Sequence, residues 1–285
     1  MTPAAGGERL EAPAKLNLCL QITGRRADGY HLLNSVVVFT DFGDRLTVKP
    51  GTGADSIEVK GPFAWALSRE SDNLCLQAIT AFREAGGAIG PLAITLEKHI
   101  PVGAGLGGGS SDAAVILRYL ERHASSCLGP EPLAKLALAL GADVPVCLAG
   151  GAIHVRGIGD ILHPVDPAPR GYIVLSRPET MLSTPAVFRA FAAGGQSFAK
   201  ATVEPTGKTA KQIAEAGNDL LAAAQDLCPE ITALIADLKR CPGAEAVQMT
   251  GSGSACFALF PDAAAAAAAA ARLTAAGRWA VASSF

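Results

Sequence analysis

An α+β protein with two domains is the fold class that the sequence predicts. Segments patterned as strands and as helices follow one another without regular β-α-β alternation, which disfavours a doubly wound parallel sheet. The chain has 285 residues, enough for one large domain or two modest ones. A loop rich in Gly, Pro and Asp at 157–171 is the best candidate for a junction. We therefore expect an N-terminal domain at 1–156 and a C-terminal domain at 157–285.

The first half of the chain is predicted to begin with strands and to end with helices. The first strand leads into a turn at 24–31, where Asp28-Gly29 is a strong turn signal. Ser71 is suited to cap the helix that follows it. The predicted elements are strands at 10–22, 35–39, 45–49, 56–59 and 92–97, with the short ones antiparallel, and helices at 72–84, after the glycines at 107–109, and at 131–140.

The second half mixes strands and helices more evenly. The alanine run at 263–271 is expected to form a surface helix, because alanine is the best helix former and only weakly apolar. The predicted elements are strands at 152–156, 172–176, 245–249, 255–260 and 279–284, and helices near 184–193, 217–226, 229–240 and 263–271.

Composition excludes several classes of protein. Apolar residues make up 49% of the chain and charged residues 18%, which excludes a disordered protein. The net charge of −2 gives no global basic field of the kind that nucleic-acid-binding proteins use. The seven cysteines are scattered and form no C-x-x-C pair, so neither a zinc site nor a disulfide framework is expected. We see no signal peptide and no apolar run of about 18 residues, and expect a cytoplasmic protein that does not engage a membrane.

The strongest functional signal is the glycine-rich segment PVGAGLGGGSSDAA at 101–114. Five glycines lie within seven positions, which costs backbone entropy that an ordinary strand-to-helix connection does not need. Their N–H groups can converge on a phosphate, and Ser110 and Ser111 lie where a helix begins and favours an anion. The alternative is a plain connection with a serine N-cap. We predict a phosphate-binding loop, with the Asp112 carboxylate complementing the helix dipole while it faces away from the phosphate.

Four motifs occur in a fixed order along the chain: APAKLNLCLQITGRRADGYHLL at 12–33, PVGAGLGGGSSDAA at 101–114, GADVP at 141–145 and MTGSGSACFALF at 249–260. Together they resemble the GHMP kinases, a family of small-molecule kinases, over essentially the whole chain. GYH at 29–31 and GGGSS at 107–111 are similar to the members that phosphorylate a cytidine diphosphate derivative of methylerythritol. The departure from that pattern is Asp112, where an asparagine is common.

This resemblance implies a fold, a reaction and its cofactors. The fold would be the two-domain GHMP kinase fold, with an N-terminal domain like domain 2 of ribosomal protein S5 and a ferredoxin-like C-terminal domain. Residues 1–156 would bind the nucleotide and carry the catalytic groups, and residues 157–285 would complete the substrate cleft. The reaction would transfer a phosphoryl group from ATP, with Mg²⁺, to the 2-hydroxyl of that cytidine diphosphate derivative, in the non-mevalonate isoprenoid pathway. Neither a nucleic acid nor a membrane is an expected partner.

Two charged residues are the candidates for catalysis. Asp143 lies in the GADVP segment, and the acceptor hydroxyl of a phosphoryl transfer needs a proton acceptor. Lys15 interrupts an otherwise apolar strand. On the residues alone, an aspartate that bonds its own turn and a lysine that reaches solvent at a sheet edge are the commoner cases. The resemblance assigns both to a catalytic pair, Asp143 as the base and Lys15 as its electrostatic partner.

The resemblance also assigns the binding positions, none of them a metal ligand. The ATP loop would comprise Pro101, Val102, Gly103, Ala104, Gly105, Leu106, Gly107, Gly108, Gly109, Ser110 and Ser111. Asn73 matches a position near the adenine, although it could instead begin a helix. The substrate-binding positions would be Asn17, Tyr30, His31, Thr184 and Phe188. Tyr30 and Phe188 would stack on the cytosine, and His31 would bond its polar edge.

Several of these positions have structural alternatives that the sequence leaves open. Asn17 could be a polar strand-edge residue, and a phenylalanine in a helix, such as Phe188, usually belongs to a core. Gly251 and Gly253 permit either a close backbone approach at the cleft or a tight turn before a strand. The glycine loop therefore predicts phosphate binding by itself, whereas the remaining assignments depend on the resemblance.

Two other functions stay open at this point. One is another GHMP kinase, of the homoserine or mevalonate type, against which GYH at 29–31 and GGGSS at 107–111 argue. The other is a non-catalytic nucleotide-binding protein on the same fold. The presence of both Lys15 and Asp143 argues against it, because a scaffold needs neither. Fold alone does not separate these functions.

Overall fold

The computed structural model describes residues 7–67, 73–195, 197–200 and 202–285. The chain forms two compact units made of interleaved segments. Unit 1 comprises Met1–Ala14, Gly43–Val102 and Gly107–Ala149, and unit 2 comprises Lys15–Phe42, Gly103–Leu106 and Gly150–Phe285. Each unit is made of three separate segments, so no single boundary divides them. A domain boundary at 157–171 therefore stays a prediction.

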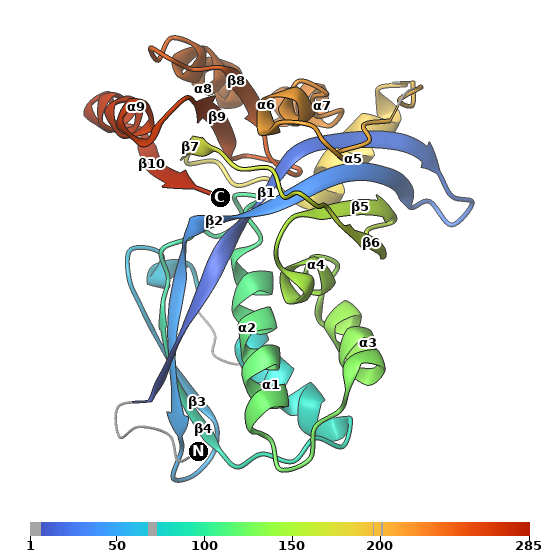
Figure 1. Cartoon of the computed structure of the whole chain (residues 1–285), viewed down its shortest axis with the longest axis vertical. Coiled ribbons are helices and arrows are strands. Elements are labelled where there is room, and N and C mark those ends of the chain that lie inside the picture. Colours follow the sequence, from blue (N-terminus) through green and yellow to red (C-terminus); the bar gives the residue numbers. More distant parts are fainter. Residues whose placement is uncertain (1–6, 68–72, 196, 201) are drawn as a thin grey trace. The chain divides into compact units, whose positions relative to one another are not determined.

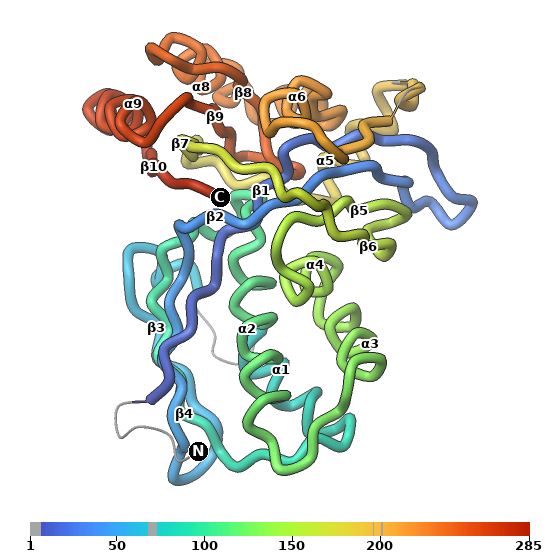
Figure 2. Tube along the Cα trace, in the orientation of Figure 1, coloured from blue at the N-terminus to red at the C-terminus, as the bar shows by residue number. Residues whose placement is uncertain are grey.

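Two long paired strands contribute to both units, and Figure 2 shows them as neighbouring blue traces. β1 covers Glu8–Arg25 and β2 covers His31–Pro50. In unit 1, Arg45–Pro50 of β2 pairs with β4, and in unit 2, Leu33–Val37 pairs with β5. The expectation of two short strands, at 35–39 and 45–49, was wrong, because β2 runs through both without a break. Gly43, between them, resembles a turn signal in the sequence. Gly43 is instead a close approach to β1: a Cβ at this position would lie 2.4 Å from the Ala12 carbonyl oxygen.

Unit 1 packs helices beside a small sheet (Figure 1). Its other elements are β3 (Ser56–Lys60), a 3₁₀ turn (Ala64–Ala66), α1 (Leu74–Glu84), β4 (Leu92–Glu97), α2 (Gly108–His123), α3 (Pro130–Leu140) and α4 (Val144–Ala149). β3 pairs with β4 in parallel, so the expected antiparallel arrangement of residues 56–59 was wrong. α2 buries a face that includes Ala113, Ile116, Leu117 and Leu120. α1 packs on α2 and α3, and α2 packs on α4, so α2 is the central helix of the unit.

Two helix ends in unit 1 differ from the sequence-based expectation. Ser71, the expected N-cap, lies outside the described residues, and the structure begins α1 at Leu74. Asn73 is the N-cap, and its Oδ1 accepts a hydrogen bond from the backbone N–H of Cys75 at 2.9 Å. The GADVP segment was expected to be a turn, but it leads directly into the short helix α4, whose proline stands in the first turn where the missing N–H costs nothing.

Unit 2 adds a hairpin and a second sheet with helices (Figure 1). Its elements are β5 (Ile153–Gly157), β6 (Ile161–Pro164), β7 (Tyr172–Arg177), α5 (Thr184–Ala193), α6 (Ala210–Ala214), α7 (Leu221–Leu227), α8 (Glu230–Lys239), β8 (Ala246–Met249), β9 (Cys256–Phe260), α9 (Ala263–Ala275) and β10 (Trp279–Ser284). The second sheet has the order β10-β7-β9-β8, with antiparallel neighbours throughout. α8 and α9 pack on this sheet and bury a core of aliphatic and aromatic side chains. The mixed α+β class is confirmed.

Two short elements of unit 2 escaped the sequence analysis, and one helix was only partly understood. β6 lies inside the loop expected at 157–171, and α6 is five residues long, held by a capping box between Thr209 and Gln212. The alanine helix α9 exists, but it buries Ala266, Ala269 and Ala270 and therefore belongs to the core on one face.

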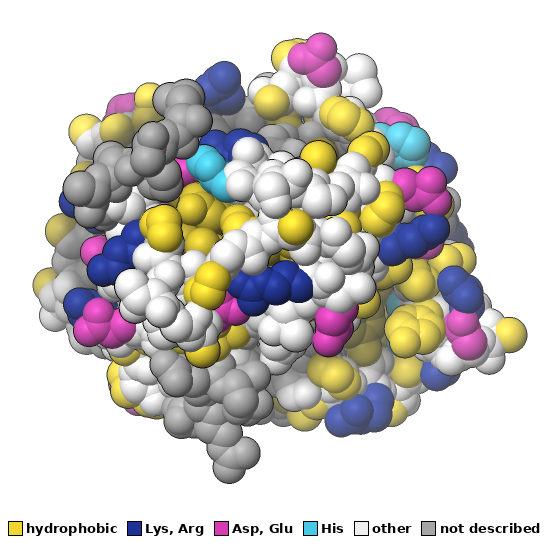
Figure 3. All heavy atoms as spheres, turned by 90° about the horizontal axis from the view of Figure 1, so that it is seen from below, with side chains coloured by type: hydrophobic (Ala, Val, Ile, Leu, Met, Phe, Trp, Pro, Cys, Tyr) yellow, Lys and Arg dark blue, Asp and Glu magenta, His cyan; other side chains and the backbone are white. Residues whose placement is uncertain are grey.

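The surface carries no strongly biased charge on the face shown in Figure 3, where basic and acidic side chains are interspersed. This distribution agrees with the net charge of −2. Among the helices of the described residues, none has both the length and the apolar character needed to cross a membrane.

Candidate functional site

Two glycine-containing segments of unit 2, at 103–106 and 250–254, lie against each other. A Cβ at Gly105 would lie 2.6 Å from the carbonyl oxygen of Gly253, and a Cβ at Gly251 would lie 3.2 Å from that of Gly105. The φ angles of these glycines, 77°, 81° and 56°, are positive, a region that side-chain-bearing residues rarely adopt. The 250–254 segment is therefore a tight turn that packs closely on residues 103–106, while an approach at the substrate cleft stays a prediction.

Lys15 and Asn17 lie on β1 beside these two segments. Lys15 is only 6% exposed, and its Nζ donates to Asn17 Oδ1 at 3.1 Å. Asn17 donates from Nδ2 to Ser35 Oγ and from its backbone N–H to Thr250 Oγ1, both at 2.8 Å. The backbone N–H of Lys15 donates to the Leu106 carbonyl at 2.9 Å. Lys15 is therefore a buried lysine and does not reach solvent at a sheet edge. Its strand, β1, is hydrogen-bonded to the glycine loop through Lys15 and to the 250–254 turn through Asn17.

The predicted cytosine-binding residues are partly brought together. The His31 ring stacks on Phe188, with centroids 5.3 Å apart and planes at 29°, and meets the edge of Phe191 at 5.6 Å. Burial lowers the pKa of His31, and the Arg25 charge lowers it further, so the ring is held neutral at physiological pH. A neutral imidazole can donate and accept one hydrogen bond each. Tyr30 is 61% exposed, which leaves its ring accessible to a planar ligand.

Thr184 connects this aromatic pair with the 250–254 turn. Its hydroxyl is hydrogen-bonded to that of Ser252 at 2.8 Å. Thr184 is also the first residue of α5, the helix that carries Phe188. Ser254 Oγ donates to the Thr180 carbonyl at 2.7 Å, a second tie to the chain before α5. The turn therefore fixes the start of the helix on which the aromatic residue stands.

The remainder of the glycine loop, in unit 1, forms the start of α2. Its N-cap is Gly107, with a φ of 64°, and no side chain caps the helix. The expected serine N-cap in the alternative interpretation was therefore wrong, while phosphate binding stays a prediction. Gly109 is exposed and Ser110 is half-buried, whereas Ser111 is buried. The first-turn N–H groups and the Ser110 hydroxyl thus remain available to an anion, as the phosphate-loop interpretation requires.

A buried group of three charged residues lies under this helix start, and two of them, Lys98 and Asp44, were not predicted from the sequence. Lys98 Nζ donates to Asp112 Oδ2 at 2.7 Å and to Asp44 Oδ2, and these three side chains are at most 4% exposed. Asp44 Oδ1 also accepts the backbone N–H of Ile100 at 2.7 Å. Asp112 therefore points into the interior, and a Cβ at Gly108 would meet Lys98 Nζ at 2.9 Å. The overlooked signal was a lysine at the end of a strand, directly before the loop.

The ionisation of this group is set by burial and by mutual charge. Burial raises the pKa of Asp112 to about 7, although the Lys98 charge works in the opposite direction. Burial disfavours the charged form of Lys98, but the two carboxylates outweigh it and raise its pKa. Lys98 therefore stays protonated at neutral pH, whereas Asp112 titrates there.

Asp143 and Asn73 occupy helix starts in unit 1. Asp143 is half-buried and directly precedes α4, and its carbonyl accepts the backbone N–H of Cys147 at 3.0 Å. Asn73 caps α1, so its helix-start role is confirmed, while a contact with adenine stays a prediction.

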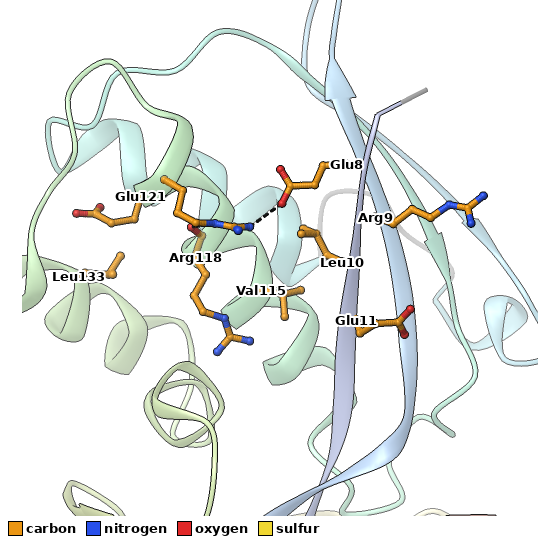
Figure 4. Close-up of a pocket in the computed structure, with 9 residues that line it drawn as sticks. Glu8, Arg9, Leu10, Glu11, Val115, Arg118, Glu121 and Leu133 are labelled. Carbon is orange, nitrogen blue, oxygen red and sulfur yellow. Dashed lines mark hydrogen bonds and ion pairs between the residues drawn. The ribbon is translucent and has the colours of Figure 1, made fainter. Parts of the chain in front are cut away.

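A cavity of about 540 Å³ in unit 1 does not coincide with the predicted site (Figure 4). Its lining comes from β1, α2 and α3 and consists of Glu8, Arg9, Leu10, Glu11, Val115, Arg118, Glu121, Arg122 and Leu133. Acidic and basic groups alternate along it, with Arg122 bonded to Glu8 at 2.7 Å. None of these lining residues is one that the sequence predicted for the site.

Comparisons with known proteins agree with the motif order. The family model for the GHMP kinases N terminal domain matches residues 73–151, and the model for GHMP kinases C terminal matches residues 198–278. A Paracoccus denitrificans protein named 4-diphosphocytidyl-2-C-methyl-D-erythritol kinase is 47% identical over 281 residues, which is 96% of each chain. A Brucella abortus protein of the same name is 44% identical over 257 residues, 88% of this chain and 85% of the relative.

Solved structures give the same result for the fold. The crystal structure of a 4-(cytidine 5'-diphospho)-2C-methyl-D-erythritol kinase superposes with a TM-score of 0.76 at 35% identity, covering 97% of this chain and 98% of the other. A homoserine kinase from Cytophaga hutchinsonii shares the fold alone, with a TM-score of 0.67 at 16% identity and coverage of 100% and 96%. By sequence along nearly its whole length and by fold, the chain belongs to the GHMP kinase family.

Proposed function

We propose that this ATP-dependent kinase phosphorylates the 2-hydroxyl of 4-diphosphocytidyl-2-C-methyl-D-erythritol, in the non-mevalonate route to isoprenoid precursors. The observation that carries the proposal is the 47% identity, over 96% of both chains, with a relative named for that substrate. The 35% identical crystal structure of the same name supports it. Homoserine and mevalonate kinases match at 16% and 13% identity, a likeness that extends to the fold and not to a substrate.

The ATP phosphates would bind to the loop from Pro101 to Ser111. The uncapped N–H groups at the start of α2 and the half-buried hydroxyl of Ser110 support this role, because both favour an anion. The charge of Lys98 under the same helix start is taken up by Asp44 and Asp112, so the N–H groups and the hydroxyl would hold the anion. Asn73, at the N-cap of α1, would lie near the adenine.

Mg²⁺ would enter with the ATP rather than reside in the protein. A magnesium ion in a kinase is held by substrate phosphates, by waters and by one or two protein oxygens. The described residues contain no group of three His, Cys, Asp or Glu side chains placed to hold a metal ion. The Ser110 hydroxyl at the helix start is an oxygen donor of the kind that Mg²⁺ accepts. Bound there, the ion would neutralise charge on the phosphates.

For the chemistry, Asp143 would accept the proton of the substrate hydroxyl, and Lys15 would be its electrostatic partner. Phosphoryl transfer depends mainly on positioning and charge stabilisation. Asp143 is half-buried at the start of a helix, and Lys15 is buried and oriented by Asn17. The fold thus holds the backbone of Asp143 and the side chain of Lys15, which suits groups that act by position.

For the substrate, Tyr30 and Phe188 would hold the cytosine by stacking, and His31 would bond its polar edge. The neutral state of His31 supports this, since a cytosine edge offers both a donor and an acceptor. Asn17 and Thr184 would contact the remainder of the substrate. Residues 1–156 would form the nucleotide-binding and catalytic domain, and residues 157–285 would complete the substrate site.

We also propose that the protein works in the cytoplasm. All seven cysteines are free thiols, and six of them are buried, which suits a reducing compartment.

The test is a coupled ADP-release assay with a panel of hydroxyl acceptors. The panel contains the cytidine substrate, its uridine analogue, free methylerythritol, homoserine and mevalonate. We expect the highest kcat/KM for the cytidine substrate, a lower value for the uridine analogue, and almost no turnover of the other three. A site that hydrogen-bonds a base edge rejects an analogue that leaves buried polar groups unsatisfied.

Two outcomes would contradict the proposal. Equal kcat/KM for methylerythritol with and without its cytidine diphosphate group would show that the protein has no cytosine-binding site. Turnover of homoserine or mevalonate in preference to the cytidine substrate would assign the chain to another reaction of the family. Asp143→Asn tests the base separately: removing a positioned base costs roughly 10²–10⁴ in rate, and near wild-type kcat would exclude that role.

A further inference from the structure

The short helix α4 is the element that positions Asp143. It has six residues, Val144–Ala149, too few for a helix to be stable by itself in water. Its terminal carbonyl groups lack partners within the helix and need them from elsewhere. The side chain that supplies them is Arg118 of α2, whose Nη1 donates to the carbonyl oxygens of Cys147 at 2.9 Å and Leu148 at 3.1 Å.

One residue, Cys147, connects this arginine to the backbone of Asp143. The N–H of Cys147 donates to the Asp143 carbonyl at 3.0 Å, while the carbonyl of Cys147 accepts the bond from Arg118. Arg118 thus holds the far end of the single helical turn that starts at Asp143. Because α2 also begins with the glycines and Ser110, the same helix bears the phosphate-loop serine and the clamp on Asp143.

The charge of Arg118 is used for this contact and not for a salt bridge. Burial lowers the pKa of Arg118, yet in the described part of the chain it forms no ion pair with a carboxylate. A cation at the C-terminal end of a helix is favoured by the helix dipole, and hydrogen bonds from a charged donor are stronger than neutral ones. Figure 4 shows its side chain extending away from Glu8.

Arg122, one turn further along α2, is the natural comparison. Its side chain is 57% exposed and forms a surface ion pair with Glu8 at 2.7 Å. A pair of this kind contributes little to stability. The two arginines therefore share a helix and a charge, but only Arg118 contacts the Asp143 helix.

We propose that Arg118 is a positioning residue for the phosphoryl transfer, which fixes Asp143 relative to the phosphate loop by bonding the C-terminal carbonyls of α4. This inference rests on the proposed role of Asp143 as the base. Displacing a catalytic group by about 1 Å costs up to roughly 10²-fold in rate, so loss of the clamp should reduce kcat without removing the ATP site.

The experiment is a double-mutant cycle on the full chain, measured with the cytidine substrate and ATP. Arg118→Met removes the donors and keeps the aliphatic stem, Arg118→Lys keeps a single charged donor group, and Arg122→Met is the matched control. We expect Arg118→Met to lower kcat roughly 10–100-fold while KM for ATP changes less than about twofold. Arg118→Lys should recover part of the loss, and Arg122→Met should leave kcat unchanged.

The coupling with Asp143 separates positioning from a general structural role. If Arg118 acts through Asp143, Arg118→Met should cost nothing further in the Asp143→Asn background. An equal fold-loss in both backgrounds would overturn the inference, as would a kcat for Arg118→Met within about twofold of Arg122→Met. Should Arg118→Met fail to fold, Arg118→Lys in the same cycle decides. Asp143→Asn alone reports on the base, so the failure of that role is distinguishable from the failure of the clamp.

Discussion

Two buried lysines, Lys15 in unit 2 and Lys98 in unit 1, have very different surroundings. Lys98 is bonded to two carboxylates, Asp44 and Asp112, inside a group that is at most 4% exposed. Lys15 donates to the neutral amide oxygen of Asn17 on its own strand. The ammonium of Lys98 is thus held by two buried carboxylates, whereas a neutral amide oxygen is among the groups that orient the ammonium of Lys15. Burial alone therefore does not assign a lysine to the fold or to catalysis, and the proposed catalytic role of Lys15 has to be tested by substitution.

The largest expected effect is on activity, in Lys15→Met. Methionine fills a similar volume without the charge, so the fold should be retained while the charge on the transferred group loses its partner. We expect kcat to fall roughly 10²–10⁴-fold, the range seen when preorganised electrostatic or proton-transfer groups are removed. Steady-state kinetics and a thermal melt on the same sample measure both. Near wild-type kcat in a folded variant would remove Lys15 from the catalytic proposal.

The matched change, Lys98→Met, should act mainly on stability. It leaves the carboxylates of Asp44 and Asp112 buried without their cation, and breaking a buried pair in this way costs about 3–5 kcal/mol. A Tm lower by roughly 6–20 °C is expected for a protein of this size, read by calorimetry. The triple change with Asp44→Asn and Asp112→Asn should recover part of the loss, because it removes the uncompensated charges. If Lys98→Met melted like the wild type, the comparison between the two lysines would collapse.

A smaller and pH-dependent effect belongs to Asp112. Its pKa in the folded protein is raised to about 7 from a usual value near 4, chiefly by burial. The folded state therefore binds this proton more tightly than the unfolded state, so its contribution to stability is present at low pH and lost as pH rises through about 7.

The asparagine in Asp112→Asn cannot titrate, so the variant should lack this dependence of stability on pH. Between pH 5 and 8 the wild type should lose more Tm than Asp112→Asn, by roughly 2–4 °C for each kcal/mol involved. Thermal melts across that range measure how steeply the Tm of each protein falls with pH. A difference in Tm that is the same at every pH does not affect the comparison. Parallel curves would mean that Asp112 stays ionised throughout. Three groups interact electrostatically with the Asp112 carboxylate and influence its pKa: Asp44, Lys98 and the buried thiol of Cys75.

The smallest expected effect is on substrate binding, in Tyr30→Ala. Stacking on a base is worth about 1–3 kcal/mol, so KM for the cytidine substrate should rise roughly 5–150-fold. KM for ATP should stay nearly unchanged, because the change is remote from the nucleotide loop in the sequence and on an exposed residue. A shift in KM for ATP of the same size would assign Tyr30 to another role.

The sequence was sufficient for the fold class and for the elements with strong periodic patterns. β4, α2 and α5 lie where their patterns place them, because one face of each is buried and leaves a regular apolar signature. β2 was divided because Gly43 resembles a turn, although it is required by the Ala12 backbone. α4, α6 and β6 are four to six residues long, too short for a period to be visible.

For the candidate site, the local motifs were predictable and the long-range partners were not. The glycines, Lys15 and Asp143 stand in motifs that can be recognised from neighbouring residues. Lys98 and Asp44 are 54 positions apart, and only the folded chain shows that they share a carboxylate–ammonium contact. Arg118 likewise resembles any surface arginine of an amphipathic helix until its carbonyl partners are known.

The interleaving of the two units has a consequence for synthesis on the ribosome. Unit 1 has all its segments once Ala149 has been made, whereas unit 2 requires the chain up to Phe285. The middle of β1 depends on late partners: Leu20 N–H donates to the Gly217 carbonyl at 3.0 Å, and Ile22 N–H to Asp219 Oδ2 at 2.7 Å. About 190 residues separate the end of β1 from Asp219. At about 5–20 residues per second, the β1–β2 pair therefore waits roughly ten to forty seconds for those partners. During that interval its exposed strand edges make it the part of the nascent chain that a chaperone would most need to cover.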